Sequence, residues 1–462
     1  MTEPSDESRT VHDGRTMPED KRTSILLLGV DRYVVSACCR LGVDAVAVYG
    51  PVTRDNGLQE IPDGVTAVFC DDHRNPEAVL TALHRAGLAD RQFDAVQTTD
   101  EWALVTAAVL GAALGCRALD SGAAVLFRDK YLQKERVRAA GVLTARTWLV
   151  EDIHFLDGDV PPMPFTPAVI KPVAGAGTSQ TSVVNDGAEL ETLARAYRKR
   201  RTASRTFVAE EFMEGQEWTA DGIVSGGELV FYGLGEYGAS CLSVIESGAS
   251  LRMRKFDPHT ERWAYDLAGP VVLAALTALG APDGVFHMEL FHDPETGQVA
   301  FSECALRRGG ALTQEEIHCK FNVDLGEAAV LCALGDRPAP VVKVRSGTVG
   351  SSYLPSRAGT LLSCPTPEQL RQLPDVEFAR IDQPPGMVLP EAFGATGERL
   401  GQVMFTTDSV DLLDQRVEET QSWFLEHLRV IPHEVVTRRL RDWSREVVGA
   451  DYADVLYDPE GK

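Results

Sequence analysis

Short apolar runs alternate with helix-type patterns along the first quarter of the chain. Ser24–Val30, Asp44–Tyr49 and Phe93–Thr98 predict buried strands, and an alanine-rich stretch after the last of them predicts a long helix. Strands that alternate with helices are typical of a parallel sheet covered on both faces. We therefore predict a parallel α/β domain over residues 23–120, preceded by a polar, disordered tail over residues 1–22.

Beyond residue 120 the predicted strands follow one another with fewer helices between them, which indicates a more antiparallel region. A helix is predicted from Pro270 to Leu279, with proline in its first turn and Gly280 just past its end. The strands predicted in this region are Thr147–Val150, Ala168–Lys171, Phe207–Glu210, Trp218–Val224, Leu229–Leu234, Val285–Phe291 and Val299–Cys304.

These patterns divide the chain into lobes. Two prolines mark a boundary near residue 335, and helix-type patterns return over Val410–Leu428 and Val435–Val448. The predicted fold class is α/β, with α+β character in the central part. After residue 120 we predict a central lobe at 121–235, a C-terminal lobe at 236–340, a mixed α/β region with helices at 341–450, and a tail at 451–462.

Composition and charge narrow the function. The 462 residues suggest about three domains, and 45 basic against 68 acidic residues give a net charge of −23. Such a chain repels phosphate backbones and anionic membrane surfaces, so neither nucleic acid nor a membrane is expected as a partner. The nine cysteines form no Cys-x-x-Cys pair, no signal peptide is recognisable and no apolar run reaches about 18 residues. We predict a cytoplasmic protein with reduced thiols.

A glycine-rich turn follows the strand that ends in Lys171. Gly175 and Gly177 let backbone N–H groups approach an anion closely, and the lysine supplies a point charge for phosphate. The lysine precedes the glycines, so the spacing matches neither a P-loop nor a Gly-x-Gly-x-x-Gly motif. A plain glycine-rich hairpin would give the same pattern.

An acidic segment ends the strand that begins at Phe207. Glu210 and Glu211 stand beside the apolar Phe212 and Met213, and Glu217 follows after a turn. Carboxylates in that setting can accept hydrogen bonds from an adenine amine and from ribose hydroxyls. A solvated, charged hairpin end is the alternative interpretation.

The hairpin around the Asp-Pro-Glu-Thr-Gly turn carries two further carboxylates. Side chains alternate along a strand, so His287 and Glu289 share one face. A hairpin centred on Thr296 places Glu289 directly opposite Glu303, where like charges are unfavourable unless a cation binds between them. Mg²⁺ is typically held by one or two carboxylates together with substrate phosphates. A one-residue slip in register would instead put the two carboxylates on opposite faces.

Two stretches suggest contacts with substrate. Arg307 follows Glu303 by four residues and can bind a phosphate bidentately, and Arg308 and Gly309 come next. The stretch Tyr232–Lys255, which contains Glu236, is rich in glycine and serine and suggests a flexible cover over the site. Ordinary surface turns and solvated loops remain open as interpretations of both stretches.

The order of these stretches is more specific than any one of them. Lys130, the lysine and glycine turn, the acidic segment and the carboxylate hairpin follow one another as they do in the ATP-grasp family, which the chain resembles over roughly residues 24–430. The resemblance is strongest to carboxylate–amine ligases, including the bacterial L-amino-acid ligases that make dipeptides. It is carried by VIKP with its glycine turn, AEEFMEGQEW and GVFHMELFHDPETGQVAFSECALRRGG.

The resemblance implies an ATP-grasp fold with a Rossmann-like N-terminal domain, a central ATP-binding lobe and a C-terminal lobe with the metal hairpin. It implies ATP and Mg²⁺ (or Mn²⁺) as cofactors, small carboxylate and amine substrates such as amino acids, and a homodimer as one assembly known in the family. The roles it implies are Lys130 and Lys171 at the phosphates, Gly175, Gly177, Thr178 and Ser179 in a mobile lid, Glu210, Glu211, Phe212 and Met213 at adenine, Glu217 at ribose, Glu289 and Glu303 at the metal, and catalysis by Arg307 with Lys171. His287, Glu236, Arg307, Arg308 and Gly309 are the candidates for substrate contacts.

One departure from the family pattern keeps alternatives open. Many ATP-grasp enzymes have Asn two residues after the second metal carboxylate, where this chain has Ala305. The predicted activity is ATP-dependent amide formation through an acyl phosphate. Another ATP-grasp reaction (acid–thiol ligase or carboxylase type) and a non-catalytic nucleotide-binding regulator are the alternatives. A Rossmann dehydrogenase is disfavoured, because Gly29 stands after the first strand without a Gly-x-Gly-x-x-Gly motif.

Overall fold

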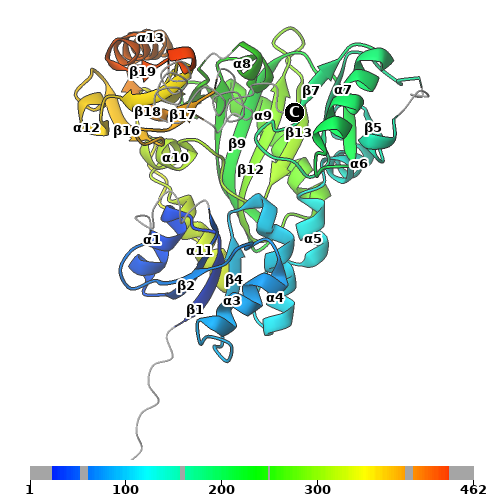
Figure 1. Ribbon diagram of the computed structural model, residues 1–462, viewed down its shortest axis with the longest axis vertical. Coiled ribbons are helices and arrows are strands. Elements are labelled where there is room, and N and C mark those ends of the chain that lie inside the picture. The colour runs from blue at the N-terminus through cyan, green and yellow to red at the C-terminus, as the bar shows by residue number, and fades with distance from the viewer. Residues whose placement is uncertain (1–22, 52–60, 157–161, 248–249, 391–398, 436–462) are drawn as a thin grey trace, which may run out of the picture.

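The computed structural model describes residues 23–51, 61–156, 162–247, 250–390 and 399–435. In Figure 1 the N-terminal sheet lies at the lower end, and a large antiparallel sheet stands above it. A smaller sheet with its helices flanks the large one on one side, and the C-terminal elements flank it on the other.

The N-terminal sheet is parallel, with strand order β3-β2-β1-β4. The first strand, β1 (Ser24–Leu28), is buried along its whole length, as expected for a strand covered on both faces. The carboxylate of Asp31 caps the following helix α1, and Gly42 ends that helix in the left-handed conformation. The remaining elements are α1 (Arg32–Leu41), β2 (Asp44–Tyr49), β3 (Thr66–Phe69), α3 (Pro76–Arg85), β4 (Ala95–Thr98), a 3₁₀ turn (Glu101–Ala103) and α4 (Leu104–Leu114).

The second sheet is antiparallel and four-stranded, with strand order β5-β8-β6-β7. The apolar side chains of this sheet pack against α7, and together they form a separate hydrophobic core. Its elements are β5 (Thr147–Val150), a 3₁₀ turn (Ile153–Phe155), β6 (Ala168–Pro172), β7 (Ser182–Val184), α7 (Gly187–Arg200) and β8 (Phe207–Glu211). Two helices, α5 (Ser121–Leu126) and α6 (Lys130–Ala139), lead into it from the N-terminal sheet.

The large antiparallel sheet has strand order β13-β12-β9-β10-β11-β14-β18-β16. Its core is built on α9 and the strands β9, β12 and β13. The elements are β9 (Gln216–Ser225), β10 (Glu228–Tyr237), α8 (Cys241–Ser247), β11 (Arg252–Lys255), α9 (Arg262–Leu279), β12 (Gly284–His292), β13 (Val299–Ala305), α10 (Thr313–Phe321), β14 (Thr348–Tyr353), β16 (Val376–Ile381) and β18 (Gly401–Thr407).

The C-terminal part adds a three-stranded sheet and two helices around one further core. They are β15 (Gly359–Ser363), α12 (Pro367–Leu370), β17 (Val388–Leu389), α13 (Val410–His427) and β19 (Arg429–Ile431). The predicted helix at Val410–Leu428 therefore forms within one residue of its expected end. The predicted helix at Val435–Val448 and both predicted tails lie almost entirely outside the described residues.

The helix α11 (Leu325–Leu334) returns from the large sheet to the N-terminal one. Its apolar residues share a core cluster with β1, α1 and β2. The contact with α1 is close at Gly326, where an added Cβ would stand 2.8 Å from the Cβ of Tyr33 and 2.9 Å from its backbone. The N-terminal sheet is thus covered in part by a segment that follows it by more than 200 residues.

The prediction of a helix beginning at Pro270 is wrong, because α9 begins at Arg262 and carries this proline in its interior. Proline removes the hydrogen bond that would be made to the carbonyl of Asp266, which normally disfavours a helix. Here a buried stripe that includes Ala264, Ala268 and Val272 continues through the proline. Packing of that stripe outweighs the local cost, as tertiary context often outweighs propensity.

The close approach of α1 and α11 gives a stability prediction. Gly326→Ala is expected to lower the free energy of unfolding by about 1–3 kcal/mol, because the added methyl group overlaps Tyr33. Urea denaturation would measure the change. Cys39→Ala, at an exposed position of α1, serves as the control and is expected to stay within about 0.5 kcal/mol of the original protein. A more stable Gly326→Ala variant would show that α1 and α11 are not held together at this point.

Candidate active site

A cavity of about 720 Å³ lies between the four-stranded and the eight-stranded antiparallel sheets, beside the N-terminal parallel sheet. Every residue that the sequence predicts to belong to the site lines this cavity, with the exception of Glu236. The walls bring together Lys130, Lys171, Gly175, Gly177, Thr178, Ser179, Glu210, Glu211, Phe212, Met213, Glu217, His287, Glu289, Glu303, Arg307, Arg308 and Gly309. Segments up to about 180 residues apart in the chain therefore meet at one place.

Lysine and glutamate side chains alternate along the floor of the cavity and directly beneath it. The carboxylate of Glu303 lies 3.4 Å from Lys130 Nζ and 3.3 Å from Lys171 Nζ. Lys171 also lies 3.1 Å from Glu210, and Lys134 lies 3.4 Å from the same carboxylate. The lysines hold the pKa of Glu303 well below its usual range despite its burial. Burial lowers the pKa of Lys134 to about 8, against the opposing pull of Glu210.

Lys134 was not predicted from the sequence, and its position explains how the carboxylate hairpin is built. In that hairpin Glu289 stands directly opposite Glu303, as expected, but the next pair is Leu290 with Phe301. Ser302 is the extra residue of a β-bulge, and its carbonyl accepts a hydrogen bond of 2.5 Å from Lys134 Nζ. The predicted pairing is confirmed, but the bulge rather than the turn alone sets the register.

The helix α6 fixes this edge strand at a second point. The amide side chain of Gln133 donates to the carbonyl of Cys304 at 3.0 Å and accepts from its N–H at 2.8 Å. β13 is the edge strand of the large sheet, so these groups would otherwise lack a partner. Cys304 itself is buried in the core, as its alternation with Glu303 predicts.

The glycine-rich turn between β6 and β7 covers one side of the cavity. Gly177 and Thr178 both adopt left-handed backbone conformations, with φ near +60°. The ammonium group of Lys130 donates to the carbonyl of Gly175 at 2.8 Å, which ties the turn to the start of α6. The turn therefore lies over the lysines that the sequence placed beside it.

The two carboxylates at the end of β8 face different partners. Glu211 forms a bidentate pair with the exposed Arg146, at 2.7 and 2.8 Å. Glu210 is buried, and its Oε1 atom accepts no hydrogen bond from any described residue. Glu217 accepts from the backbone N–H of Cys241, and burial together with the nearby charge of Glu289 raises the pKa of Glu217 to about 7.

A buried aspartate that the sequence did not reveal connects the hairpin to the arginine turn. Asp221 on β9 stands opposite His287 in the strand register, and His287 Nδ1 lies 2.7 Å from its carboxylate. The same carboxylate accepts from Lys255 Nζ at 3.0 Å and from the N–H of Gly309 at 3.1 Å. Burial opposes the charge of Asp221, but these cations hold its pKa well below the usual range.

Gly309 fits this position because it has no side chain. A Cβ there would stand 2.6–2.8 Å from Thr313, Asp221 and His287. The hydrogen bond that Gly309 donates to Asp221, together with this tight packing, fixes the turn that carries Arg307 and Arg308 against the strands that carry the carboxylates.

Both arginines reach across to loops of the N-terminal sheet. Arg307 donates twice to Glu101, at 2.5 and 2.8 Å, and Arg308 pairs with Asp31 at 2.9 Å. These acids follow β4 and β1, and ligands of open parallel sheets bind at such carboxyl ends. Their position directly after predicted strands was a signal in the sequence, but neither acid was predicted as a site residue.

Glu236 does not line the cavity. It lies on β10, where it accepts from Arg254 at 2.7 Å, and Arg254 also pairs with Glu261. Neighbouring side chains alternate along a strand, so Tyr237 lines the cavity and Glu236 points away. The predicted flexible cover over Tyr232–Lys255 is largely regular structure, formed by the end of β10, α8 and β11.

The carboxylates suit a hard divalent cation that shares its ligands with a substrate. Within the described residues, no group of three or more His, Cys, Asp or Glu side chains is arranged to hold a metal. Glu289 and Glu303 are adjacent across the hairpin and both line the cavity. Two carboxylates completed by phosphate oxygens are a usual arrangement for Mg²⁺.

Comparison with known proteins identifies the fold. No family model matches the chain. The L-amino acid ligase of Bacillus licheniformis superposes with a TM-score of 0.71 at 20% identity, over 89% of this chain and 99% of that one. The chain has the ATP-grasp fold. The N5-carboxyaminoimidazole synthetase of Staphylococcus aureus, solved with ADP, superposes on this ATP-grasp chain with a TM-score of 0.64 at 14% identity, over 86% and 97% of the two chains.

A sequence relative points the same way. The L-arginine-specific L-amino acid ligase of Bacillus subtilis is 23% identical over 298 residues, which are 64% of this chain and 70% of that protein. These similarities confirm the predicted resemblance to ATP-grasp ligases. Among the described residues, no helix has the length and apolar character needed to cross a bilayer.

The raised pKa of Glu217 gives a prediction about stability and pH. An unfolded Glu titrates near 4.5, whereas Glu217 titrates near 7 in the folded chain. Between these values the folded state keeps a proton that the unfolded state has lost, so stability falls as the pH rises. Glu217→Gln removes this loss and is expected to raise the free energy of unfolding at pH 8 by on the order of 3 kcal/mol, and by less at pH 5.

Urea denaturation at the two pH values would measure this difference. Glu228→Gln, at an exposed position, is the matched control and is expected to show no pH-dependent change. An equal effect of Glu217→Gln at both pH values would contradict the raised pKa.

Proposed function

We propose that the chain is an ATP-dependent carboxylate–amine ligase that joins an amino acid to an amine through an acyl phosphate. The observation that carries the proposal is the meeting of Lys130, Lys171, Glu303 and Arg307 in one cavity with the glycine-rich turn. The similarity to two L-amino acid ligases supports an amino acid as the acid substrate.

ATP would bind between the two antiparallel sheets. Lys130 and Lys171 would lie at its phosphates, under the turn that contains Gly175, and the orphan Oε1 atom of Glu210 would accept from the adenine amine. Glu217 would accept from a ribose hydroxyl. A relative of the same fold has been solved with ADP, which supports a nucleotide in this position.

Glu289 and Glu303 would hold Mg²⁺, which would neutralise charge on the phosphate oxygens. Before the nucleotide binds, Lys130 and Lys171 compensate the charge of Glu303. When phosphates enter, these lysines can turn to them, and the carboxylate becomes available to the cation. Ala305 has no side-chain donor, so this cation would draw its remaining ligands from the phosphates and water.

The chemistry would proceed in two displacements. A carboxylate oxygen attacks the γ-phosphorus of ATP, the bond to the β–γ bridging oxygen breaks, and ADP leaves. The amine nitrogen then attacks the acyl carbon, the bond to phosphate breaks, and phosphate and a proton are released. Arg307 and Lys171 supply fixed positive charge where negative charge develops, and the glycine-rich turn excludes water from the acyl phosphate.

The test is ATP-dependent phosphate release over a panel of amino acids, singly and in pairs, with hydroxylamine as a trap. Hydroxylamine attacks an acyl phosphate and yields a hydroxamate, so it reports the first displacement alone. We expect hydroxamate with a single amino acid, and an amide with a second one. Glu303→Gln is expected to lower the rate by roughly 100-fold or more, because it removes a metal ligand.

Glu295→Gln makes the same substitution in the exposed turn of the same hairpin and is expected to leave the rate unchanged. Bicarbonate and thiols complete the panel as substrates. Phosphate release that requires bicarbonate, or a thiol, would replace the proposal with a carboxylase-type or acid–thiol reaction. Tight ATP binding without turnover on any of these compounds would replace it with a nucleotide-binding regulator.

A further inference from the structure

A second cavity, of about 550 Å³, lies at the carboxyl ends of the N-terminal parallel strands. The loops after β1, β2, β3 and β4 all contribute to its wall, through Asp31, Pro51, Asp71 and Asp100 among others. The chain runs from β1 outward to β3 and then crosses to β4 on the other side. The loops after β1 and β4 therefore diverge, which is where open parallel sheets bind ligands.

This cavity opens directly onto the proposed ATP site. Four residues line both cavities, namely Asp31, Thr99, Asp100 and Arg308. Arg308 is the neighbour of Arg307, which would lie at the reacting phosphate. A molecule in the second cavity would thus have one end close to the acyl phosphate.

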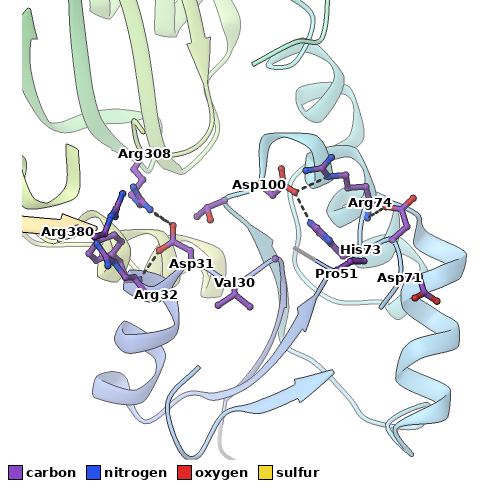
Figure 2. Close-up of a pocket in the computed structure, with 15 residues that line it drawn as sticks. Val30, Asp31, Arg32, Pro51, Asp71, His73, Arg74, Asp100, Arg308 and Arg380 are labelled. Atoms are coloured by element: carbon purple, nitrogen blue, oxygen red, sulfur yellow. Dashed lines mark hydrogen bonds and ion pairs between the residues drawn. The ribbon is translucent and has the colours of Figure 1, made fainter. Parts of the chain in front are cut away.

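The two ends of the second cavity differ in charge. Figure 2 shows Arg308, Arg380 and Arg32 gathered around Asp31 on one side, and His73, Arg74 and Asp71 on the other. Arg308 pairs with Asp31 at 2.9 Å, and Arg380 pairs with Asp382 at 2.6 Å. An arginine in a single ion pair keeps further N–H donors that can bind a carboxylate.

Carboxylates exceed cations at the opposite end. Asp100 lies 2.7 Å from His73 and 3.1 Å from Arg74. Among the described residues, the carboxylate of Asp72 accepts a hydrogen bond only from the backbone N–H of Arg74, and Asp71 forms no ion pair. Three carboxylates thus face one guanidinium and one imidazole, so this end favours a cationic group.

We propose that the second cavity binds the amine-donating substrate, as an α-amino acid with a cationic side chain. The carboxylate lies at Arg308 and Arg380, and the side chain extends toward Asp71 and Asp72. The α-amine is one carbon away from the carboxylate, so anchoring the carboxylate at Arg308 brings the nitrogen to the shared opening. The cavity volume lies in the ordinary range for small-molecule sites.

The inference rests on the proposed function, and the experiment separates the two. L-lysine and L-norleucine serve as amine donors, because they have similar shapes and only the first carries a side-chain ammonium. With the acid and ATP saturating, we expect a higher kcat/KM for L-lysine by roughly tenfold or more. The double variant Asp71→Asn/Asp72→Asn is expected to abolish most of that ratio by raising the KM for L-lysine. Arg380→Gln is expected to raise the KM for both donors.

Asp63→Asn/Asp90→Asn removes the same number of exposed carboxylates outside the cavity and is expected to keep the ratio of the original protein. Equal kcat/KM for the two donors, or a ratio that survives Asp71→Asn/Asp72→Asn, would overturn the inference. A rise in the KM of the acid in the hydroxamate reaction of this variant would also overturn it, since the cavity would then hold the acid. The absence of hydroxamate from the original protein with every acid would instead count against the proposed function itself.

Discussion

The cavity depends on a buried cluster of ion pairs between three lysines and two glutamates. Glu303 on β13 faces Lys130 from α6 and Lys171 from β6, and Glu210 faces Lys171 and Lys134. An unpaired buried charge would cost several kcal/mol, so none of these groups is stable alone. The ion pairs therefore hold α6 and the strands of two sheets in one arrangement before any nucleotide binds.

Further hydrogen bonds and ion pairs connect this cluster to the carboxylate hairpin and to the N-terminal sheet. The bulge at Ser302 brings Glu289 and Glu303 opposite each other, and Lys134 satisfies the carbonyl that the bulge leaves unpaired. Asp221 then joins the hairpin to the turn that carries Arg307. Arg307 in turn reaches Glu101, in the turn after β4 of the N-terminal sheet. The N-terminal sheet and the two antiparallel sheets that line the cavity thus share one electrostatic network.

The sequence predicted those parts of the site that local motifs carry. The lysine with its glycine turn, the acidic strand end and the carboxylate hairpin line one cavity, because each motif is a strand end or turn that can be recognised by itself. Lys134, Asp221 and Glu101 were missed because their roles come from partners more than 60 residues away. The interior proline of α9 and the place of Glu236 on β10 were misjudged for a related reason, since tertiary packing and strand register decide them.

The return of α11 to the N-terminal sheet affects how this architecture can be exchanged between relatives. The core around β1 and α1 contains apolar side chains from Leu325–Leu334. A fragment of residues 23–120 would therefore expose the apolar face of its sheet that α11 covers, and it would not fold as an independent unit. Recombination that swaps substrate-binding loops between relatives has to carry α11 with them, or replace the loops individually on the existing sheet.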